Sequence, residues 1–122
     1  MERIMVVDDE EKVCLYMRKF LRKLGYQVFT VLNGVDAIKL QKTIRPHVVL
    51  LDVLMPKPDG LTVLQKIKEH DPGTTVIMVT ALHDDETGIQ ALKLGADGYI
   101  TKPIDPKYLQ EVVEAKITLA TL

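Results

Sequence analysis

The sequence has a single cysteine, no apolar run long enough to span a membrane and no dense run of lysine and arginine. One thiol cannot form an internal disulfide, and no metal-ligand spacing surrounds Cys14, so we interpret it as a packing residue. Residues 1–4 lack a signal-peptide apolar segment, and the cytoplasm is therefore the expected location. With 16 basic and 17 acidic residues, the whole chain has no strong electrostatic preference for nucleic acid or an anionic membrane.

Short β-rich segments alternate with segments of helical period along the 122 residues. Residues 48–51 are all apolar, which is typical of a strand covered on both faces. Five strands, each followed by a helix, predict right-handed crossovers and one α/β domain over residues 1–122. The expected fold is the flavodoxin-like doubly wound (βα)5 arrangement, a five-stranded parallel sheet of order 2-1-3-4-5 between two helix layers. We expect strands at residues 3–7, 27–31, 48–51, 76–79 and 99–100, and helices at about residues 10–24, 34–44, 61–67, 84–94 and 104–120.

Acidic side chains follow the first and third of these strands. Asp8 and Asp9 come directly after residue 7, and Asp52 comes directly after residue 51. The carboxyl ends of parallel strands meet at one edge of a sheet, so we expect the three carboxylates to converge. Carboxylate oxygens are ligands that Mg²⁺ prefers, and the sequence therefore predicts a magnesium site there. Asp52, alone at the end of the most buried strand, is the best nucleophile for forming an acyl phosphate.

Two further strand ends carry groups that suit a phosphoryl group. The ammonium of Lys102 and the hydroxyl of Thr80 could each contact one phosphoryl oxygen, and the backbone N–H of Ala81 could serve a third. A cis bond before Pro103 would turn Lys102 inward, but only about one X-Pro bond in twenty is cis, so the sequence leaves this open. Taken singly, these residues also fit purely structural roles, as helix caps, as acidic residues in turns or as hydroxyls at strand ends. Their joint placement at four strand ends favours a site.

The motifs that carry these residues resemble the receiver domain of two-component response regulators over nearly the whole chain. The resemblance implies that Asp52 is the phosphoacceptor and that Lys102 senses the phosphate. It also implies a switch pair, Thr80 and Tyr99, and a Mg²⁺ site completed by the Leu54 carbonyl. The resembling segments are Val6-Val7-Asp8-Asp9-Glu10, Asp52-Val53-Leu54-Met55-Pro56, Asp59-Gly60, Thr80-Ala81, Gly95-Ala96-Asp97-Gly98-Tyr99 and Lys102-Pro103.

The function that this resemblance implies is a signalling switch rather than an enzyme with an outside substrate. Phosphorylation would change the surface formed by the fourth helix, fifth strand and fifth helix. The implied partners are a sensor histidine kinase or phosphotransferase and a downstream target or linked output domain, with homodimerisation on phosphorylation as an option. No direct contact with nucleic acid or membrane is expected. The apolar period of the last helix, at Leu109, Val113, Ile117 and Ala120, does not finish before the chain does, which favours a longer regulator over a complete single-domain one.

An apolar stripe on the first helix has two interpretations. It is wider than a one-sided core needs, so part of it could dock a kinase or phosphotransferase, but core packing with scattered surface residues explains it equally well. The three histidines share no ligand spacing and are interpreted as solvent or loop residues. The stripe is formed by Val13, Tyr16, Met17, Phe20 and Leu21, and the histidines are His47, His70 and His83.

Two competing functions are weaker. A haloacid-dehalogenase-like, Mg²⁺-dependent aspartyl phosphatase would need a second Asp two residues after the nucleophile, where Leu54 stands. A flavodoxin-like flavin binder would need a Ser, Thr or Gly-rich loop after the first strand. The acidic residues 8–11 would instead repel the phosphate of that cofactor.

Overall fold

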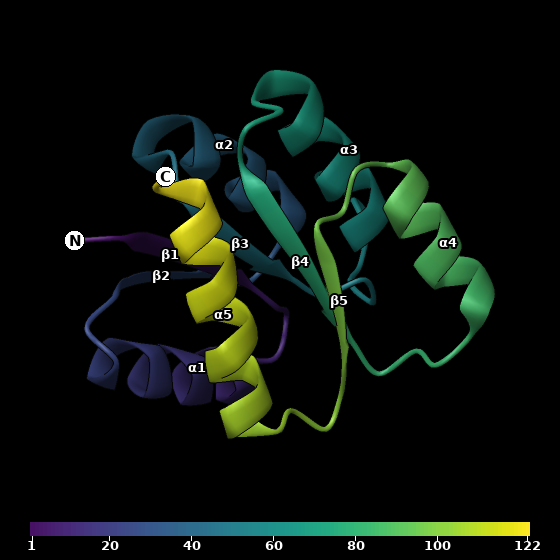
Figure 1. Ribbon diagram of the computed structural model, residues 1–122. Coiled ribbons are helices and arrows are strands. Elements are labelled where there is room, and N and C mark those ends of the chain that lie inside the picture. The colour runs from purple at the N-terminus through teal and green to yellow at the C-terminus, as the bar shows by residue number, and fades with distance from the viewer.

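The computed structural model describes residues 1–122 as an α/β fold with five parallel strands and five helices (Figure 1). The strand order is β2-β1-β3-β4-β5, which confirms the order expected from the sequence. Every neighbouring pair of strands is parallel, so all five carboxyl ends lie at one edge of the sheet. The strands are β1 (Arg3–Val7), β2 (Gln27–Val31), β3 (Val48–Leu51), β4 (Thr75–Thr80) and β5 (Gly98–Thr101).

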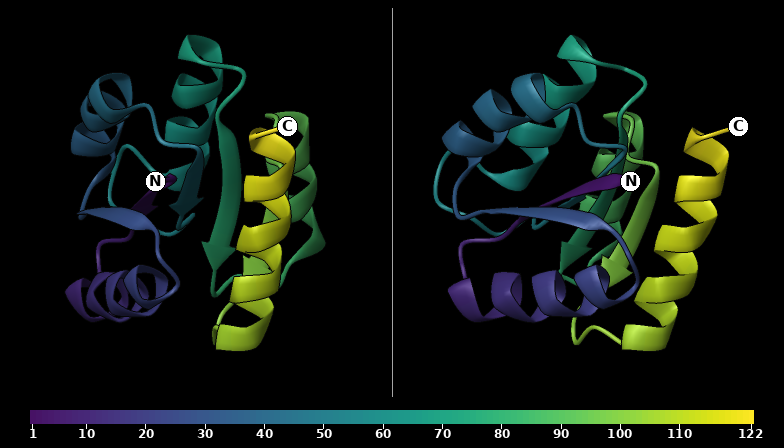
Figure 2. Two further views of the ribbon diagram at one scale, coloured as in Figure 1. Left: turned by 60° about the vertical axis from the view of Figure 1, so that its left-hand side comes forward. Right: turned by 90° about the vertical axis from the view of Figure 1, so that its left-hand side faces the viewer.

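The helices form two layers, α1 and α5 on one face of the sheet and α2, α3 and α4 on the other (Figure 2). Each face of the sheet has its own buried apolar cluster. In β3, Val48 and Leu50 belong to the cluster under α1 and α5, whereas Val49 and Leu51 belong to the other. This two-sided burial explains why β3 has no polar alternation. The helices are α1 (Glu11–Lys23), α2 (Gly34–Ile44), α3 (Gly60–His70), α4 (Asp85–Lys93) and α5 (Pro106–Ala120).

Four of the five helices start after a capping side chain, α1 being the exception, and the cap of α5 corrects one expected boundary. Asp105 accepts a hydrogen bond from the backbone N–H of Lys107 at 3.0 Å, and Pro106 is the first helical residue. Proline suits that position because the first N–H of a helix has no partner within the helix. The prediction that the last helix starts near residue 104 was therefore wrong by two residues. The strands β4 and β5 are also slightly longer than expected, because the pairing runs from Ile77 opposite Gly98 to Thr80 opposite Thr101.

Several single-residue predictions can be compared with the structure. The bond between Lys102 and Pro103 is cis. Cys14 is buried and its thiol donates to the backbone oxygen of Asp8 at 3.3 Å, which confirms a packing role. His70 and His83 are exposed, while His47 is half-buried and its Nδ1 accepts from the backbone N–H of Arg3. None of the five helices is both long and apolar enough to cross a bilayer.

Candidate functional site

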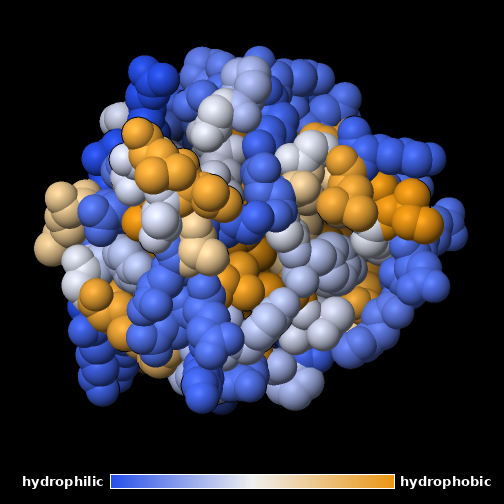
Figure 3. Space-filling view, in the orientation of Figure 1, coloured by the Kyte–Doolittle hydropathy of each residue, from blue (hydrophilic) through white to orange (hydrophobic).

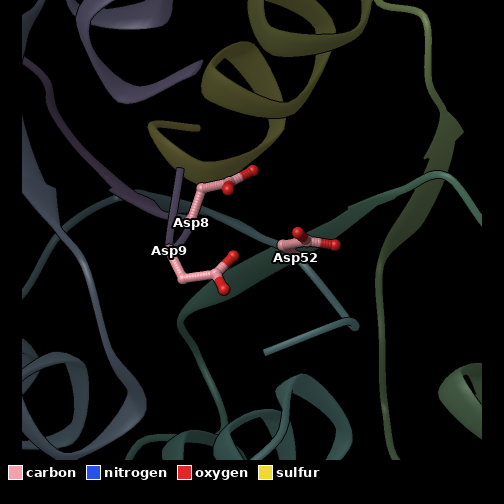
Figure 4. Close-up of side chains that lie close together, drawn as sticks. All are labelled: Asp8, Asp9 and Asp52. Atoms are coloured by element: carbon pink, nitrogen blue, oxygen red, sulfur yellow. The ribbon is translucent and has the colours of Figure 1, made fainter. Parts of the chain in front are cut away.

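The sheet places the first two carboxylates side by side. The strands β1 and β3 are neighbours in which Val7 lies opposite Leu51, so Asp8 and Asp52 leave adjacent strand ends. The backbone N–H of Asp52 donates to the Val7 oxygen at 3.0 Å, which extends the strand pairing by one residue. One oxygen from each of Asp8, Asp9 and Asp52 lies within 4.8 Å of the others (Figure 4). The predicted convergence of the three acids is therefore present.

Lys102 brings a positive charge into this acidic pocket. Its Nζ lies 2.8 Å from Oδ2 of Asp8, 3.2 Å from Oδ2 of Asp52 and 3.9 Å from Oε1 of Glu10. The backbone N–H of Lys102 donates to the backbone carbonyl oxygen of Thr80 at 2.7 Å, which holds the lysine next to the end of β4. Asp8 and Asp52 are each 3% exposed, so Lys102 is the cation that balances two buried carboxylates.

Burial and charge shift the proton equilibria of this pair. Burial, together with the negative charge of Asp8, raises the pKa of Asp52 even though Lys102 opposes the shift. Burial alone would lower the pKa of Lys102, but its hydrogen bond to Asp8 and the charges of Asp52 and Asp8 outweigh burial and raise it. The pocket therefore stabilises a positively charged group and destabilises the ionised form of a carboxylate that has no cation beside it.

The buried carboxylates also have backbone partners. The N–H of Leu54 donates to Oδ1 of Asp52 at 3.1 Å, and the N–H of Glu10 donates to Oδ1 of Asp8 at 2.9 Å. In each buried carboxylate, one oxygen thus accepts a hydrogen bond from the backbone N–H two residues later, and the other accepts one from Lys102. Asp9 is exposed and is not drawn into this network. Three carboxylates at this spacing form a hard oxygen donor set, which fits a divalent cation such as Mg²⁺.

Thr80 and Tyr99 both contact the residue Leu82. The buried hydroxyl of Thr80 accepts from the N–H of Leu82 at 3.2 Å, and the hydroxyl of Tyr99 lies 3.5 Å from the Leu82 carbonyl oxygen, to which it donates. Burial, with a contribution from the charge of Asp84, raises the pKa of Tyr99. The predicted switch pair is thus joined through the loop after β4. Ala81, between Thr80 and Leu82, is exposed.

Two residues at the site had no role in the sequence interpretation. Glu10 lies within ion-pair distance of Lys102, as given above, although it was noted only as part of a motif. Gly60, the first residue of α3, donates its N–H to the oxygen of Val53 at 3.0 Å. Its sequence signal was the Asp59-Gly60 pair, which by itself indicates only a turn and a helix cap.

The apolar stripe on α1 is divided between core and surface. Met17 and Leu21 are buried in the cluster under α1 and α5. Val13 and Phe20 are partly buried against that cluster, while Tyr16 is 42% exposed. The rings of Tyr16 and Phe20 stack with their centroids 6.3 Å apart. Core packing therefore accounts for part of the stripe, and docking stays a prediction for the rest.

Comparison with known proteins agrees with this geometry. Residues 4–114 match the family described as response regulator receiver domain, and the chain belongs to that family, whose members act in the phosphorelays of two-component systems. The alkaline phosphatase synthesis transcriptional regulatory protein PhoP of Bacillus subtilis is 35% identical over 93% of this chain and 48% of its own length. The chemotaxis protein CheY of Halobacterium salinarum is 35% identical over 96% of this chain and 98% of its own.

Solved structures show the same fold. A CheY-like receiver domain protein from Methanospirillum hungatei superposes with a TM-score of 0.96 at 28% identity, covering 99% of this chain and 97% of its own. The chain spans about half the length of several curated relatives that it matches, for example 48% of PhoP. The remaining half of those longer proteins is outside the compared region.

Proposed function

We propose that Asp52 is the phosphoacceptor of a two-component phosphorelay and receives its phosphoryl group from a histidine kinase or phosphotransferase. One observation carries the proposal: a buried carboxylate at the end of β3 lies 3.2 Å from Lys102 and belongs to a cluster of three acids. A nucleophilic carboxylate next to a cation and an oxygen-rich ligand set is what aspartyl phosphorylation requires.

The metal in this proposal is Mg²⁺. Asp8, Asp9 and Asp52 would hold it together with the backbone carbonyl of Leu54. When bound, the ion supplies positive charge that offsets the repulsion between the carboxylates and an incoming anionic phosphoryl group.

The protein's own residues account for the transfer step. An oxygen of Asp52 forms the bond to phosphorus while the bond from phosphorus to the donor histidine nitrogen breaks. The donor ring carries a proton on its other nitrogen, so it keeps the electron pair of the broken bond and leaves as neutral imidazole. Lys102 lies close enough to Asp52 to contact a phosphoryl oxygen there. The Thr80 hydroxyl accepts from Leu82, so its own hydrogen is free to be donated to a second oxygen, with the Ala81 N–H assigned to a third.

The proposed output is a shift in the surface of α4, β5 and α5. Drawing Thr80 toward the phosphoryl group would weaken its bond to Leu82, the residue that also holds the Tyr99 hydroxyl. The surface that would change carries large exposed apolar side chains: Ile89 is 52% exposed and Leu92 is 65% exposed on α4. Figure 3 shows this apolar patch over α4, on the right of the view. Such a patch suits a downstream target, a linked output domain or a second phosphorylated copy.

The kinase or phosphotransferase would approach Lys102 from the side of α1, away from the surface of α4. A hollow of about 280 Å³ there is lined by α1 residues and by the loop after β5. Its apolar walls and its position beside Lys102 suit a helix that presents a phosphohistidine. The lining residues are Lys12, Val13, Tyr16, Lys102, Pro103 and Ile104.

The test is labelling with acetyl phosphate in the presence of Mg²⁺, followed by intact mass. One phosphoryl group per chain is expected on the wild type, none on Asp52→Asn, and none on the wild type in excess chelator. Asp71→Asn, a matched change at the opposite end of the sheet, should be labelled like the wild type. Full labelling of Asp52→Asn would remove the assignment.

The competing functions gain no support. The phosphatase alternative lacks its second aspartate, because Leu54 occupies that position. The relatives named above are regulatory and chemotaxis proteins, so the proposal assigns the chain a switch and no outside substrate. A cytoplasmic location stays a prediction from the sequence, and so does an output domain beyond residue 122.

A further inference from the structure

Gly60 begins α3 at a point where the backbone leaves no room for a side chain. A methyl carbon on Gly60 would lie 2.0 Å from the carbonyl oxygen of Asp52 and 2.5 Å from Cα of Val53. Both of these atoms belong to the backbone, so no change of rotamer can relieve the overlap. The start of α3 and the end of β3 would have to separate by more than an ångström before such a side chain fitted.

This close contact falls on the segment that carries the site. The Gly60 N–H donates to the oxygen of Val53 at 3.0 Å, while the Leu54 N–H donates to Oδ1 of Asp52 at 3.1 Å. The first turn of α3 therefore touches the peptide of Asp52 and holds the next carbonyl along the chain. The start of α3 is therefore in direct contact with the segment that runs from Asp52 to Leu54.

Gly34, the first residue of α2, supports the same segment from behind. A methyl carbon on Gly34 would lie 2.6 Å from Cγ2 of Val63, and 2.7 Å from both Cγ and the carbonyl oxygen of Pro58. Val63 belongs to α3, and Pro58 belongs to the loop between β3 and α3. The loop that follows Asp52 is thus held between the start of α2 on one side and the end of β3 on the other.

We infer that Gly60, supported by Gly34, is a positioning residue for the phosphoacceptor site. The missing side chains set the distance of Asp52 and of the Leu54 carbonyl from Asp8 and Asp9, although neither glycine touches the phosphoryl group. The inference rests on the proposed function, because it assigns these groups to a Mg²⁺ and phosphoryl site.

The test compares Mg²⁺ affinity, measured by calorimetry, with the rate of labelling by acetyl phosphate. Gly60→Ala should bind Mg²⁺ about 10- to 100-fold more weakly than the wild type, which is the usual effect of losing support behind a metal ligand. Its labelling rate should fall by about 100-fold, since a displacement near an ångström has that effect on a positioned reaction. Gly34→Ala should show a smaller loss of both, because two of the three atoms it would meet belong to side chains.

Two controls separate positioning from loss of stability. Gly73→Ala meets nothing closer than 3.4 Å, the Oδ1 of Asp71, and should bind Mg²⁺ like the wild type. Val113→Ala leaves a cavity under α5, so it should lower the melting temperature without changing the Mg²⁺ affinity of the folded protein. The backbone amide spectrum of each variant, with the Leu54 resonance as the local signal, establishes that the measured protein is folded.

The outcomes distinguish the inference from the proposed function. If the wild type neither binds Mg²⁺ nor is labelled, the proposed function fails. If the wild type does both and folded Gly60→Ala matches it within twofold, the inference alone fails. If Gly60→Ala does not fold, Gly34→Ala decides, and a Mg²⁺ affinity within twofold of the wild type would overturn the inference.

Discussion

Replacing Lys102 by methionine would remove the cation that contacts both buried carboxylates while keeping most of the apolar stem. In the wild type the ammonium lies 2.8 Å from Asp8 and 3.2 Å from Asp52, whose side chains are each 4% exposed. Removing one partner of a buried ion pair costs about 3–5 kcal/mol, because the other charge is left without compensation. The Lys102 side chain is 16% exposed, so water can partly replace it, and we expect the lower end of that range.

A loss of about 3 kcal/mol corresponds to a fall in melting temperature of about 10 °C for a domain of this size. The measurement is thermal or urea unfolding at pH 7 in chelator. Since the pKa of Lys102 is raised above 10.5, its contribution is fully present at neutral pH and is lost only as the pH rises through the raised pKa. Lys39→Met, which removes an exposed lysine from α2, should change the free energy of unfolding by less than about 0.5 kcal/mol.

Saturating Mg²⁺ should reduce the difference between Lys102→Met and the wild type by more than half. Mg²⁺ stabilises both proteins, but in the variant it binds carboxylates that no ammonium occupies. We expect it to bind the variant at least about 15-fold more tightly, which at saturation removes about 1.6 kcal/mol of the difference. If the metal-free melting temperature of Lys102→Met equals that of the wild type, the ion pair does not contribute to the stability of the fold. If Mg²⁺ leaves the difference unchanged, the ammonium and the metal do not share these carboxylates.

Three further predictions concern single residues. Burial and the charge of Asp8 raise the pKa of Asp52, so the ionised carboxylate destabilises the folded protein at neutral pH. In the absence of metal, Asp52→Asn should therefore have a higher urea midpoint than the wild type at pH 7, and this difference should vanish as the pH falls toward 3.8. Burial raises the pKa of Cys14 to about 11, so a disulfide reagent at pH 8 should modify it at least about 100-fold more slowly in the folded protein than in urea; equal rates would contradict its packing role. Arg45 has a left-handed φ of 47°, and the one interaction of its largely exposed side chain is an ion pair with Asp71 at 3.7 Å. Arg45→Asn keeps the backbone hydrogen bonds and should raise the free energy of unfolding by about 1 kcal/mol; a loss of stability would refute the strain argument.

The sequence was enough to predict the sheet order and the edge at which the site lies. The run from Val48 to Leu51 is typical of a strand buried on both faces, and a parallel sheet in which β1 and β3 are neighbours then brings Asp52 beside Asp8. The fifth strand places Lys102 at the same edge for the same topological reason. The alternation of strands and helices, and hence the parallel direction of the strands, follows from the spacing of apolar residues, whereas the order 2-1-3-4-5 comes from the known doubly wound arrangement.

Other features of the site depend on distances between segments that are remote in sequence. Nothing near Gly60 indicates that a side chain there would overlap the Asp52 peptide, since the overlap exists only once α3 has packed against β3. In the same way, a helix end near Arg45 follows from the next proline, but the left-handed conformation of Arg45 does not. The apolar pattern extends the final helix back to Ile104, whereas the side chain of Asp105 caps it and makes Pro106 its first residue.

The two sides of Asp52 differ in how much movement they allow, and this difference bears on where a phosphorylation signal would travel. Toward α3, the Asp52 peptide meets the backbone of Gly60 with no space for even a methyl group, so a displacement there would have to move the whole start of the helix. Toward β4 and β5, the loop after β4 is held to Thr80 and Tyr99 by single side-chain hydrogen bonds to Leu82, one of 3.2 Å from its N–H to Thr80 and one of 3.5 Å from Tyr99 to its oxygen. The second is at the outer limit for a hydrogen bond and is therefore weak. Added charge at Asp52 would meet less resistance on this side, which is a physical reason to expect the response at α4 and β5 rather than at α3.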